Sequence, residues 1–246
     1  LHPDMPFEDF RKVLVRIKER YDSHKIMVII SGGEPLVRED LLQCGRAIYD
    51  LEFPWSMVSN GRLMTPKKID QLLSSGIHSL TISLDGFQQD HNWMRGDELS
   101  FQCATKAIEI LAKEPSIKFD VVTCANNRNY DSLEDFKEYL ISLGLKDWRI
   151  FTVFPNGRAA NDPELQLSKE RFRGVMEFIK KTRKEGRINL SYGCEGFLGE
   201  YEGYVRDHFY TCQAGLSVAS VLIDGSISAC TSIRSNYKQG NIYTDD

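Results

Sequence analysis

The chain has 246 residues, of which 41% are hydrophobic and 27% charged, and this composition allows one substantial core and a small appendage. Its formal net charge of −4, from 31 basic and 35 acidic residues, argues against a nucleic-acid-binding surface. The longest apolar runs are strand-sized, so we expect neither a membrane span nor a signal peptide. Six irregularly spaced cysteines do not resemble a secreted disulfide framework, so we expect a reduced, cytoplasmic location.

Strand and helix patterns alternate along most of the chain, after an opening helix that begins near Asp4 or Pro6. The predicted strands cover 26–31, 55–58, 78–86, 117–125 and 148–155. The predicted helices that follow them cover 38–50, 66–74, 101–113, 132–142 and 168–184. Strands spaced by helix-sized segments indicate βα repeats with right-handed connections and a parallel sheet. We therefore expect a partial barrel or an open doubly wound sheet, with one strand lost upstream of Leu1.

The pattern changes near Ile188, where glycine- and tyrosine-rich loops replace the alternation. The segment "SVASVLIDGSISACTS" (217–232) predicts a β-hairpin, because an apolar strand leads into Asp224-Gly225 and an alternating strand follows. We expect a partial barrel over 1–187 and a small β-rich appendage over 188–246. Because the chain starts without methionine and ends without a closing element, we expect both ends to be cut.

The first predicted strand ends in an unusual turn, "SGGEP" (31–35). The unbroken apolar run before it indicates a strand covered on both faces, as in a parallel sheet. Paired glycines allow the backbone to approach a ligand closely, and Pro35 ends the strand's hydrogen-bond ladder. Glu34 is therefore expected at the carboxyl end of a parallel strand, where α/β folds place their ligands.

Three further strand ends carry polar residues: "SNG" (59–61), "SLDG" (83–86) and "PNGR" (155–158). In a βα barrel these four ends would surround one pocket. A matching ligand would offer an ammonium group to Glu34 and a hydroxylated sugar to Ser83 or Asp85. Its carboxylate could meet Arg95 or Arg158. This inventory suits an amino acid joined to a nucleoside.

These motifs resemble those of the radical S-adenosylmethionine (SAM) superfamily, in its branch with a SPASM or twitch appendage. The GGEP at 32–35 matches that family's strand-end motif, "SLDGFQQDHNWMRG" (83–96) is similar to its fourth-strand segment, and "FPNGRA" (154–159) is similar to what often follows its sixth strand. The resemblance covers nearly the whole chain. It implies an incomplete TIM-like (β/α)₆ barrel with a small C-terminal appendage that contains a β-hairpin.

The resemblance also implies the cofactor, the reaction and the residues that bind. A reduced [4Fe–4S] cluster would cleave SAM to methionine and a 5′-deoxyadenosyl radical, which abstracts hydrogen from a substrate. A peptide or protein is the expected substrate, and a flavodoxin or ferredoxin the expected reductant. The expected contacts of SAM are the GGEP residues, which hold the methionine amino group, and polar residues at the next strand ends: Gly32, Gly33, Glu34, Pro35, Ser59, Asn60, Ser83, Asp85 and Asn126.

One part of the family pattern is absent from this sequence. The three-cysteine motif that holds the catalytic cluster, C-x₃-C-x₂-C, is not among the 246 residues. In the family it lies just before the first helix, so we expect it upstream of Leu1. No catalytic residue is therefore assigned within the chain.

The C-terminal cysteines are similar to the SPASM/twitch pattern, in which a hairpin carries a cysteine on either side. Cys212 precedes Gly225 by twelve intervening residues, and Cys230 follows it after four. Folding back at Asp224-Gly225 would bring the two thiolates toward one auxiliary iron–sulfur cluster. Cys194, in "YGCEG", is the expected third ligand.

Other interpretations of the same residues are open. One alternative is a degenerate barrel that binds a peptide or nucleotide without radical chemistry. Another is an ordinary α/β-barrel enzyme in which Glu34 and Asp85 do acid–base work. Taken singly, "SNG" and "PNGR" are ordinary turns. The remaining cysteines lie in helix or strand patterns and are expected to be buried core thiols: Cys44, Cys103 and Cys124.

Overall fold

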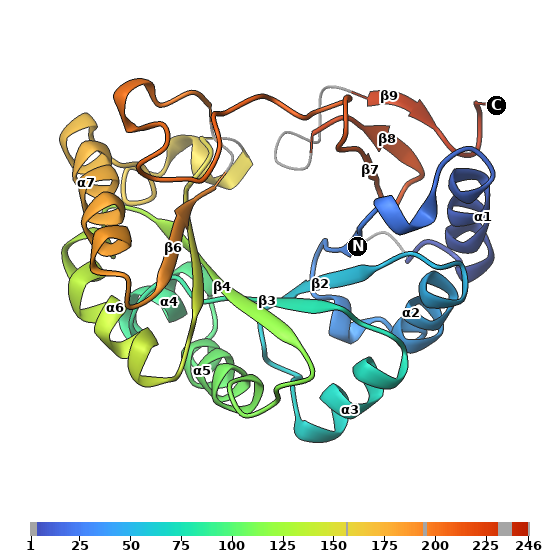
Figure 1. The fold of residues 1–246 in the computed structure, drawn as a ribbon, viewed down its shortest axis with the longest axis horizontal. Helices are drawn as coiled ribbons and strands as arrows, with labels where there is room; N and C mark the ends of the chain where they lie inside the picture. The colour runs from blue at the N-terminus through green and yellow to red at the C-terminus, as the bar shows by residue number, and fades with distance from the viewer. Residues whose placement is uncertain (1–3, 156, 194–195, 231–237, 246) are drawn as a thin grey trace.

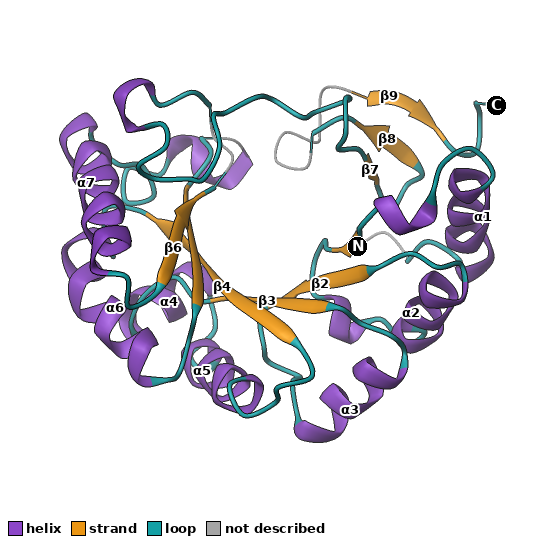
Figure 2. Cartoon of the chain, viewed as in Figure 1, coloured by secondary structure: helices purple, strands orange, loops and turns teal. Residues whose placement is uncertain are grey.

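The computed structural model describes residues 4–155, 157–193, 196–230 and 238–245 (Figure 1). Six parallel strands form one sheet in chain order, and each strand pairs with the next. Their bounds are β1 Val28–Ile30, β2 Trp55–Ser59, β3 Ser79–Ser83, β4 Lys118–Ala125, β5 Asp147–Thr152 and β6 Asn189–Tyr192. The sheet curves into a partial barrel with helices along its outer side (Figure 2). The expected α/β partial barrel is therefore confirmed.

Seven α-helices occur in the described residues. Their bounds are α1 Phe7–Lys18, α2 Leu41–Asp50, α3 Pro66–Ser74, α4 Gln88–Arg95, α5 Ser100–Leu111, α6 Leu133–Ser142 and α7 Lys169–Glu185. Local signals account for several ends: the Thr65 side chain accepts from Lys68 N–H at the start of α3, with Pro66 at its first position. Gly186 ends α7 in the left-handed conformation, with φ of 69°. No helix in the described ranges is long and apolar enough to cross a bilayer.

The two faces of the sheet differ in burial. Side chains that point outward to the helices are fully buried, and they form the main core: Trp55, Met57, Leu80, Ile82, Val121, Trp148, Ile150 and Leu190. The alternate residues that point inward are mostly only partly buried, as the strands β2 and β4 to β6 show. The core of this fold therefore lies between sheet and helices, and the inner wall of the barrel is open.

Two elements differ from the sequence-based expectation. Residues 189–192 were assigned to the appendage, but they form β6 and pair in parallel with β5, from Asp147↔Asn189 to Ile150↔Tyr192. Five strands were expected in this chain and six are present. The short "NLSY" strand was missed because glycine and tyrosine dominate the sequence that follows it. Helix α4 was also missed, since its eight residues are mostly polar and its buried side chain is a histidine, His91.

The appendage contains a three-stranded antiparallel sheet: β7 Ser220–Val221, β8 Ser226–Ser228 and β9 Lys238–Asn241. The expected hairpin is present, because β7 and β8 pair around Asp224-Gly225 and Gly225 has φ of +79°. After β6 the chain crosses to the opposite side of the barrel, where this sheet lies beside α1 (Figure 1). A hydrogen bond of 3.2 Å from Tyr243 Oη to Asp9 Oδ2 joins the two.

Candidate functional site

A pocket of about 220 Å³ lies at the carboxyl ends of β1, β2 and β3. Polar groups dominate its lining, which comes from three strand ends and from the segment between α4 and α5: Ser31, Gly32, Gly33, Val58, Ser59, Asn60, Arg62, Ser83, Arg95, Asp97 and Ser100. Five of the expected binding residues line this pocket, namely Gly32, Gly33, Ser59, Asn60 and Ser83. The parallel sheet brings them together because all of its strand ends meet at one edge.

The two glycines of the GGEP motif present bare backbone to the pocket. Gly32 has φ of +138°, a conformation that side chains rarely adopt. A Cβ added at Gly32 or Gly33 would meet no heavy atom within 4 Å. The space over both residues is therefore open, and their backbone groups can contact a ligand directly.

Glu34 lies beside the pocket and ties two strand ends together. Its Oε1 accepts hydrogen bonds from Ser59 Oγ at 2.8 Å and from Leu36 N–H at 3.0 Å. Its Oε2 accepts from Asn60 N–H at 2.7 Å. Pro35, also expected at the site, is buried at the first position of the 3₁₀ turn that Glu34 caps. Three protein donors thus fix the carboxylate, which keeps capacity for a further donor.

Asp85 does not line the pocket, although it was expected along the ligand. Its side chain is 1% exposed and holds Arg95, whose Nε and Nη2 lie 2.8 and 2.6 Å from Asp85 Oδ2. Cys124 N–H donates to Oδ1 at 3.0 Å. Burial opposes ionisation of Asp85, but the charge of Arg95 and the hydrogen bond from Cys124 N–H outweigh it and hold the pKa of this carboxyl below its ordinary value. Asp85 therefore positions Arg95, which does line the pocket.

His91 is fully buried beneath the same pocket wall. Its Nδ1 lies 3.0 Å from Asp85 N–H and 3.4 Å from Asp85 Oδ2, and these two contacts require opposite protonation of Nδ1. The shorter contact favours an unprotonated Nδ1, so the ring proton lies on Nε2. Nε2 then donates to Ser100 Oγ at 3.0 Å. The imidazole links the end of β3 to the first turn of α5.

Several lining residues were absent from the sequence-based set, among them Arg62, Asp97 and Ser100. Arg62 follows β2 and forms an ion pair with Asp97, which follows α4. Gly96 ends α4 with φ of +65° and turns the chain back toward the pocket. Gly96, which follows a run of polar residues, was the available sequence signal for this turn. It could be used only if 88–95 had first been recognised as a helix.

Asn126 lies outside the pocket lining. It is 2% exposed, and its Oδ1 accepts from Arg128 N–H at 2.9 Å while its Nδ2 donates to the Cys124 carbonyl at 3.0 Å. These bonds stabilise the turn after β4. In the structure the Asn126 side chain binds backbone groups of its own turn. Ligand contact was expected because Asn126 follows the end of β4.

The cysteines fall into two groups. Of the three cysteines expected as buried core thiols, Cys44 is buried in α2, where burial raises the pKa of its thiol, whereas Cys103 and Cys124 are only partly buried. Cys212 is exposed and Cys230 partly buried, and neither forms a disulfide. Hydrogen bonds from Ala214 N–H and then Tyr210 lower the pKa of the Cys212 thiol. Cys194, Asn156 and the Arg158 side chain lie outside the described residues. Among those described, no three or more histidine, cysteine or carboxylate side chains are grouped as metal ligands.

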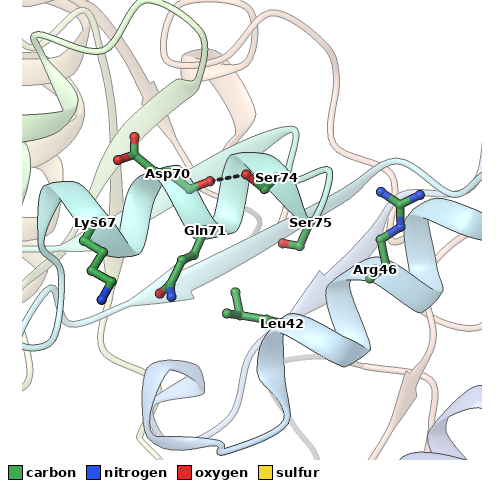
Figure 3. A pocket seen from close by; sticks show the side chains of 7 residues that line it. All are labelled: Leu42, Arg46, Lys67, Asp70, Gln71, Ser74 and Ser75. Atoms are coloured by element: carbon green, nitrogen blue, oxygen red, sulfur yellow. Dashed lines mark hydrogen bonds between the residues drawn. The ribbon is translucent and has the colours of Figure 1, made fainter.

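A second hollow of about 380 Å³ lies between α2 and α3 on the outer side of the barrel (Figure 3). Leu42 and Arg46 line it from α2, and Lys67, Asp70 and Gln71 from α3. None of the motif residues contributes to it. The strand-end pocket is therefore the better candidate site.

The structure is therefore a partial βα barrel with an open inner wall and a glycine-lined polar pocket at its strand ends, which is the class of site that suits a small polar ligand. The family model of the Radical SAM superfamily matches residues 2–140. The chain belongs to the radical SAM superfamily, and the family expected from the GGEP and SLDG motifs is confirmed.

Relatives and solved structures agree with this family. The chain is 29% identical over 171 residues to an AdoMet-dependent heme synthase of Methanosarcina barkeri, covering 69% of this chain and 48% of that protein. It is 26% identical over 203 residues to a PqqA peptide cyclase of Ruegeria pomeroyi, covering 82% and 53%. The chain thus spans about half the length of these relatives.

The fold is also that of Streptococcus suis SuiB. Its structure bound to S-adenosylmethionine superposes with a TM-score of 0.71, and its structure bound to precursor peptide SuiA with 0.72. Both matches have 16% sequence identity and cover 98% of this chain, with 57% and 56% of the SuiB chain. At this identity the likeness shows the fold alone.

Proposed function

We propose that this chain is the cofactor-binding part of a radical SAM enzyme that acts on a peptide or protein. The observation that carries the proposal is the strand-end pocket, where bare backbone at Gly32-Gly33 faces Ser83 and Arg95. Membership of the superfamily supports SAM and a [4Fe–4S] cluster as cofactors. The described residues offer no three-cysteine set for that cluster, so the proposal for this chain concerns SAM.

The lining fits the chemical groups of SAM. Backbone carbonyls near Gly32-Gly33 accept from the methionine ammonium, and the Glu34 carboxylate beside them adds negative charge. The Arg95 guanidinium, held by Asp85, meets the methionine carboxylate. Ser59, Asn60 and Ser83 offer hydroxyl and amide groups to the remaining polar atoms. The volume is below that of most whole-ligand sites, so part of SAM extends onto the open inner wall.

Bound SAM would supply the 5′-deoxyadenosyl radical chemistry of the superfamily, with a [4Fe–4S] cluster as the source of the electron. The contribution of this chain is to orient the cofactor and to shield it from water. Likeness to a PqqA peptide cyclase supports a peptide or protein as substrate. A flavodoxin or ferredoxin as electron donor completes the proposal.

The auxiliary cluster belongs to the same proposal. An added Cβ at Gly215 would lie 3.5 Å from Ala229 Cβ, so the loop after Cys212 packs beside the strand end that carries Cys230. The lowered pKa of Cys212 favours the thiolate, which is the form that binds iron. We assign Cys212 and Cys230 as ligands, with Cys194 as the third.

Gly33→Val tests the cofactor site. The valine side chain would occupy the open space over Gly33, whereas no protein atom lies close enough to disturb the fold. Isothermal titration with SAM should show binding to the parent protein and none to Gly33→Val, with Gly33→Ala between them. Unchanged thermal unfolding is the control. Normal SAM affinity in Gly33→Val would place the cofactor elsewhere.

A further inference from the structure

The inner wall of the barrel carries a charged pair in its middle. Residues at inward positions on neighbouring strands are Val58 on β2, Thr81 on β3, Asp120 on β4 and Arg149 on β5. The barrel interiors of complete TIM barrels are filled mainly by branched apolar side chains. Here the Arg149 side chain is 41% exposed and the Asp120 side chain 16%. An open charge at this position is not explained by core packing.

Arg149 is held in one orientation by two neighbours. Its Nε forms an ion pair with Asp120 Oδ2, and its Nη2 donates to Thr81 Oγ1 at 3.0 Å. Thr81 Oγ1 in turn donates to Asp120 Oδ1 at 2.6 Å. The guanidinium also lies over the Phe151 ring, with 5.9 Å from Cζ to the ring centroid. The fork of Arg149 is therefore pre-oriented, as substrate-binding arginines are.

This charged pair adjoins the proposed cofactor pocket. Thr81 pairs with Val58, which lines the pocket, and lies two positions before Ser83, which also lines it. Ser83 pairs with Val122, which pairs with Arg149 on the other side. Arg149 therefore lies on the same wall and at the same level as the inner edge of the pocket, two strands along.

We propose that Arg149 binds a carboxylate of the substrate, so that the enzyme selects an acidic residue close to the site of hydrogen abstraction. The inference rests on SAM occupying the strand-end pocket, since only then is this wall next to the reactive group. Asp120 and Thr81 engage Nε and Nη2, and the exposed remainder of the guanidinium faces the open interior. Phe151 lies against the guanidinium and Val122 pairs with Arg149, and a carboxylate at the exposed edge would form a charge-assisted hydrogen bond.

A lysine at this position would carry the same charge without the planar fork. The experiment therefore compares full-length parent protein with Arg149→Lys in the presence of SAM. The probes are two blocked tripeptides, acetyl-Gly-Glu-Gly-amide and acetyl-Gly-Gln-Gly-amide, which differ only in the carboxylate. Binding is followed by the arginine side-chain Nε–H resonances in ¹⁵N-labelled protein. Arg187→Lys is the matched control, because Arg187 pairs with Glu138 on the outer surface.

The glutamate peptide should bind the parent and Arg187→Lys at least tenfold more tightly than the glutamine peptide does, and Arg149→Lys should lose this preference. Equal binding of the two peptides, no binding of either, or an unchanged preference in Arg149→Lys would each overturn the proposal. SAM affinity is measured in the same samples. If Arg149→Lys still binds SAM, its cofactor pocket is folded. If the parent protein does not bind SAM, the result counts against the proposed function itself.

Discussion

Glu34 illustrates how one carboxylate organises the candidate site. It caps the turn after β1 and accepts hydrogen bonds from Ser59, the last residue of β2, and from Asn60, which follows it. A carboxylate can accept on both oxygens, and all three donors point at it. The residue that the motif marks as a ligand contact is thus also the link that holds two strand ends in register around the pocket.

Glu34→Gln is predicted to weaken SAM binding by roughly tenfold or more. The glutamine amide nitrogen would face another hydrogen-bond donor, either Asn60 N–H or the donors of Ser59 and Leu36. The negative charge next to the SAM ammonium would also be lost, and a charge-assisted hydrogen bond is worth about 1.5–3 kcal/mol. Isothermal titration of the cluster-containing protein measures it. Glu138→Gln, at an exposed ion pair with Arg187, is the matched control and should bind SAM normally. Equal affinity in both variants would remove Glu34 from the site.

Asp85 is predicted to contribute stability that depends on pH. Because its folded-state pKa is lowered, the contribution is complete above the unfolded value near 3.9 and is lost as pH falls through the folded-state pKa. Asp85→Asn should therefore lower the free energy of unfolding by roughly 1.5–3 kcal/mol at pH 7, and by progressively less below pH 4. Urea unfolding across this range measures the difference. A gap that stayed constant down to pH 2 would contradict the assignment.

At the residue scale, motif positions were predictable but their partners were not. "SGGEP" and "SLDG" located the pocket, since an apolar strand followed by glycine marks a strand end in any parallel sheet. Asp85 and Asn126 also lie at strand ends, yet their side chains turn inward to Arg95 and to backbone groups. Spacing along the chain does not say which way a side chain at a strand end points.

At the scale of the element, periodicity predicted the longer buried strands and helices, and it failed for a short polar helix and a four-residue strand. Helix α3 begins and ends where it was expected, from Pro66 to Ser74. The polar helix α4 and the short strand β6 are held by tertiary contacts, such as His91 against Ser100 and the pairing of β6 with β5. Such contacts are not visible in a local pattern.

Gly225→Ala is predicted to destabilise the appendage hairpin. Gly225 has φ of +79°, which costs an L-residue about 1 kcal/mol or more, and an added Cβ would lie 2.5 Å from the Tyr243 ring. Amide hydrogen exchange should therefore speed up in β7 to β9 and stay unchanged in the barrel strands. Gly186→Ala, where φ is 69° but the space is open, separates the backbone effect from the clash. If the amides of β7 to β9 exchanged equally slowly in Gly225→Ala and in Gly186→Ala, the expected clash at Gly225 would be contradicted.

On the scale of the whole molecule, the appendage is connected to the barrel after β6 and contacts it again at α1. Strand β6 joins the barrel sheet directly, and the appendage sheet lies beside α1 with the Tyr243–Asp9 hydrogen bond between them. Cys212 lies in the segment between β6 and β7, and Cys230 lies just after β8. A metal site there would stabilise the arrangement of the two parts as well as the appendage itself.

Cys212 and Cys230 are predicted to bind one auxiliary iron–sulfur cluster. The Asp224-Gly225 hairpin sets the register Ser220↔Ser228, and the contact of Gly215 with Ala229 returns the Cys212 loop to the end of β8. Cys212→Ala combined with Cys230→Ala in the full-length protein should therefore lower bound iron by about four atoms, one [4Fe–4S] cluster. Cys44→Ala with Cys103→Ala is the matched control and should leave iron unchanged, because both thiols lie on helices away from the hairpin. Iron content that stays the same in a folded Cys212/Cys230 double variant would make the pair ordinary thiols.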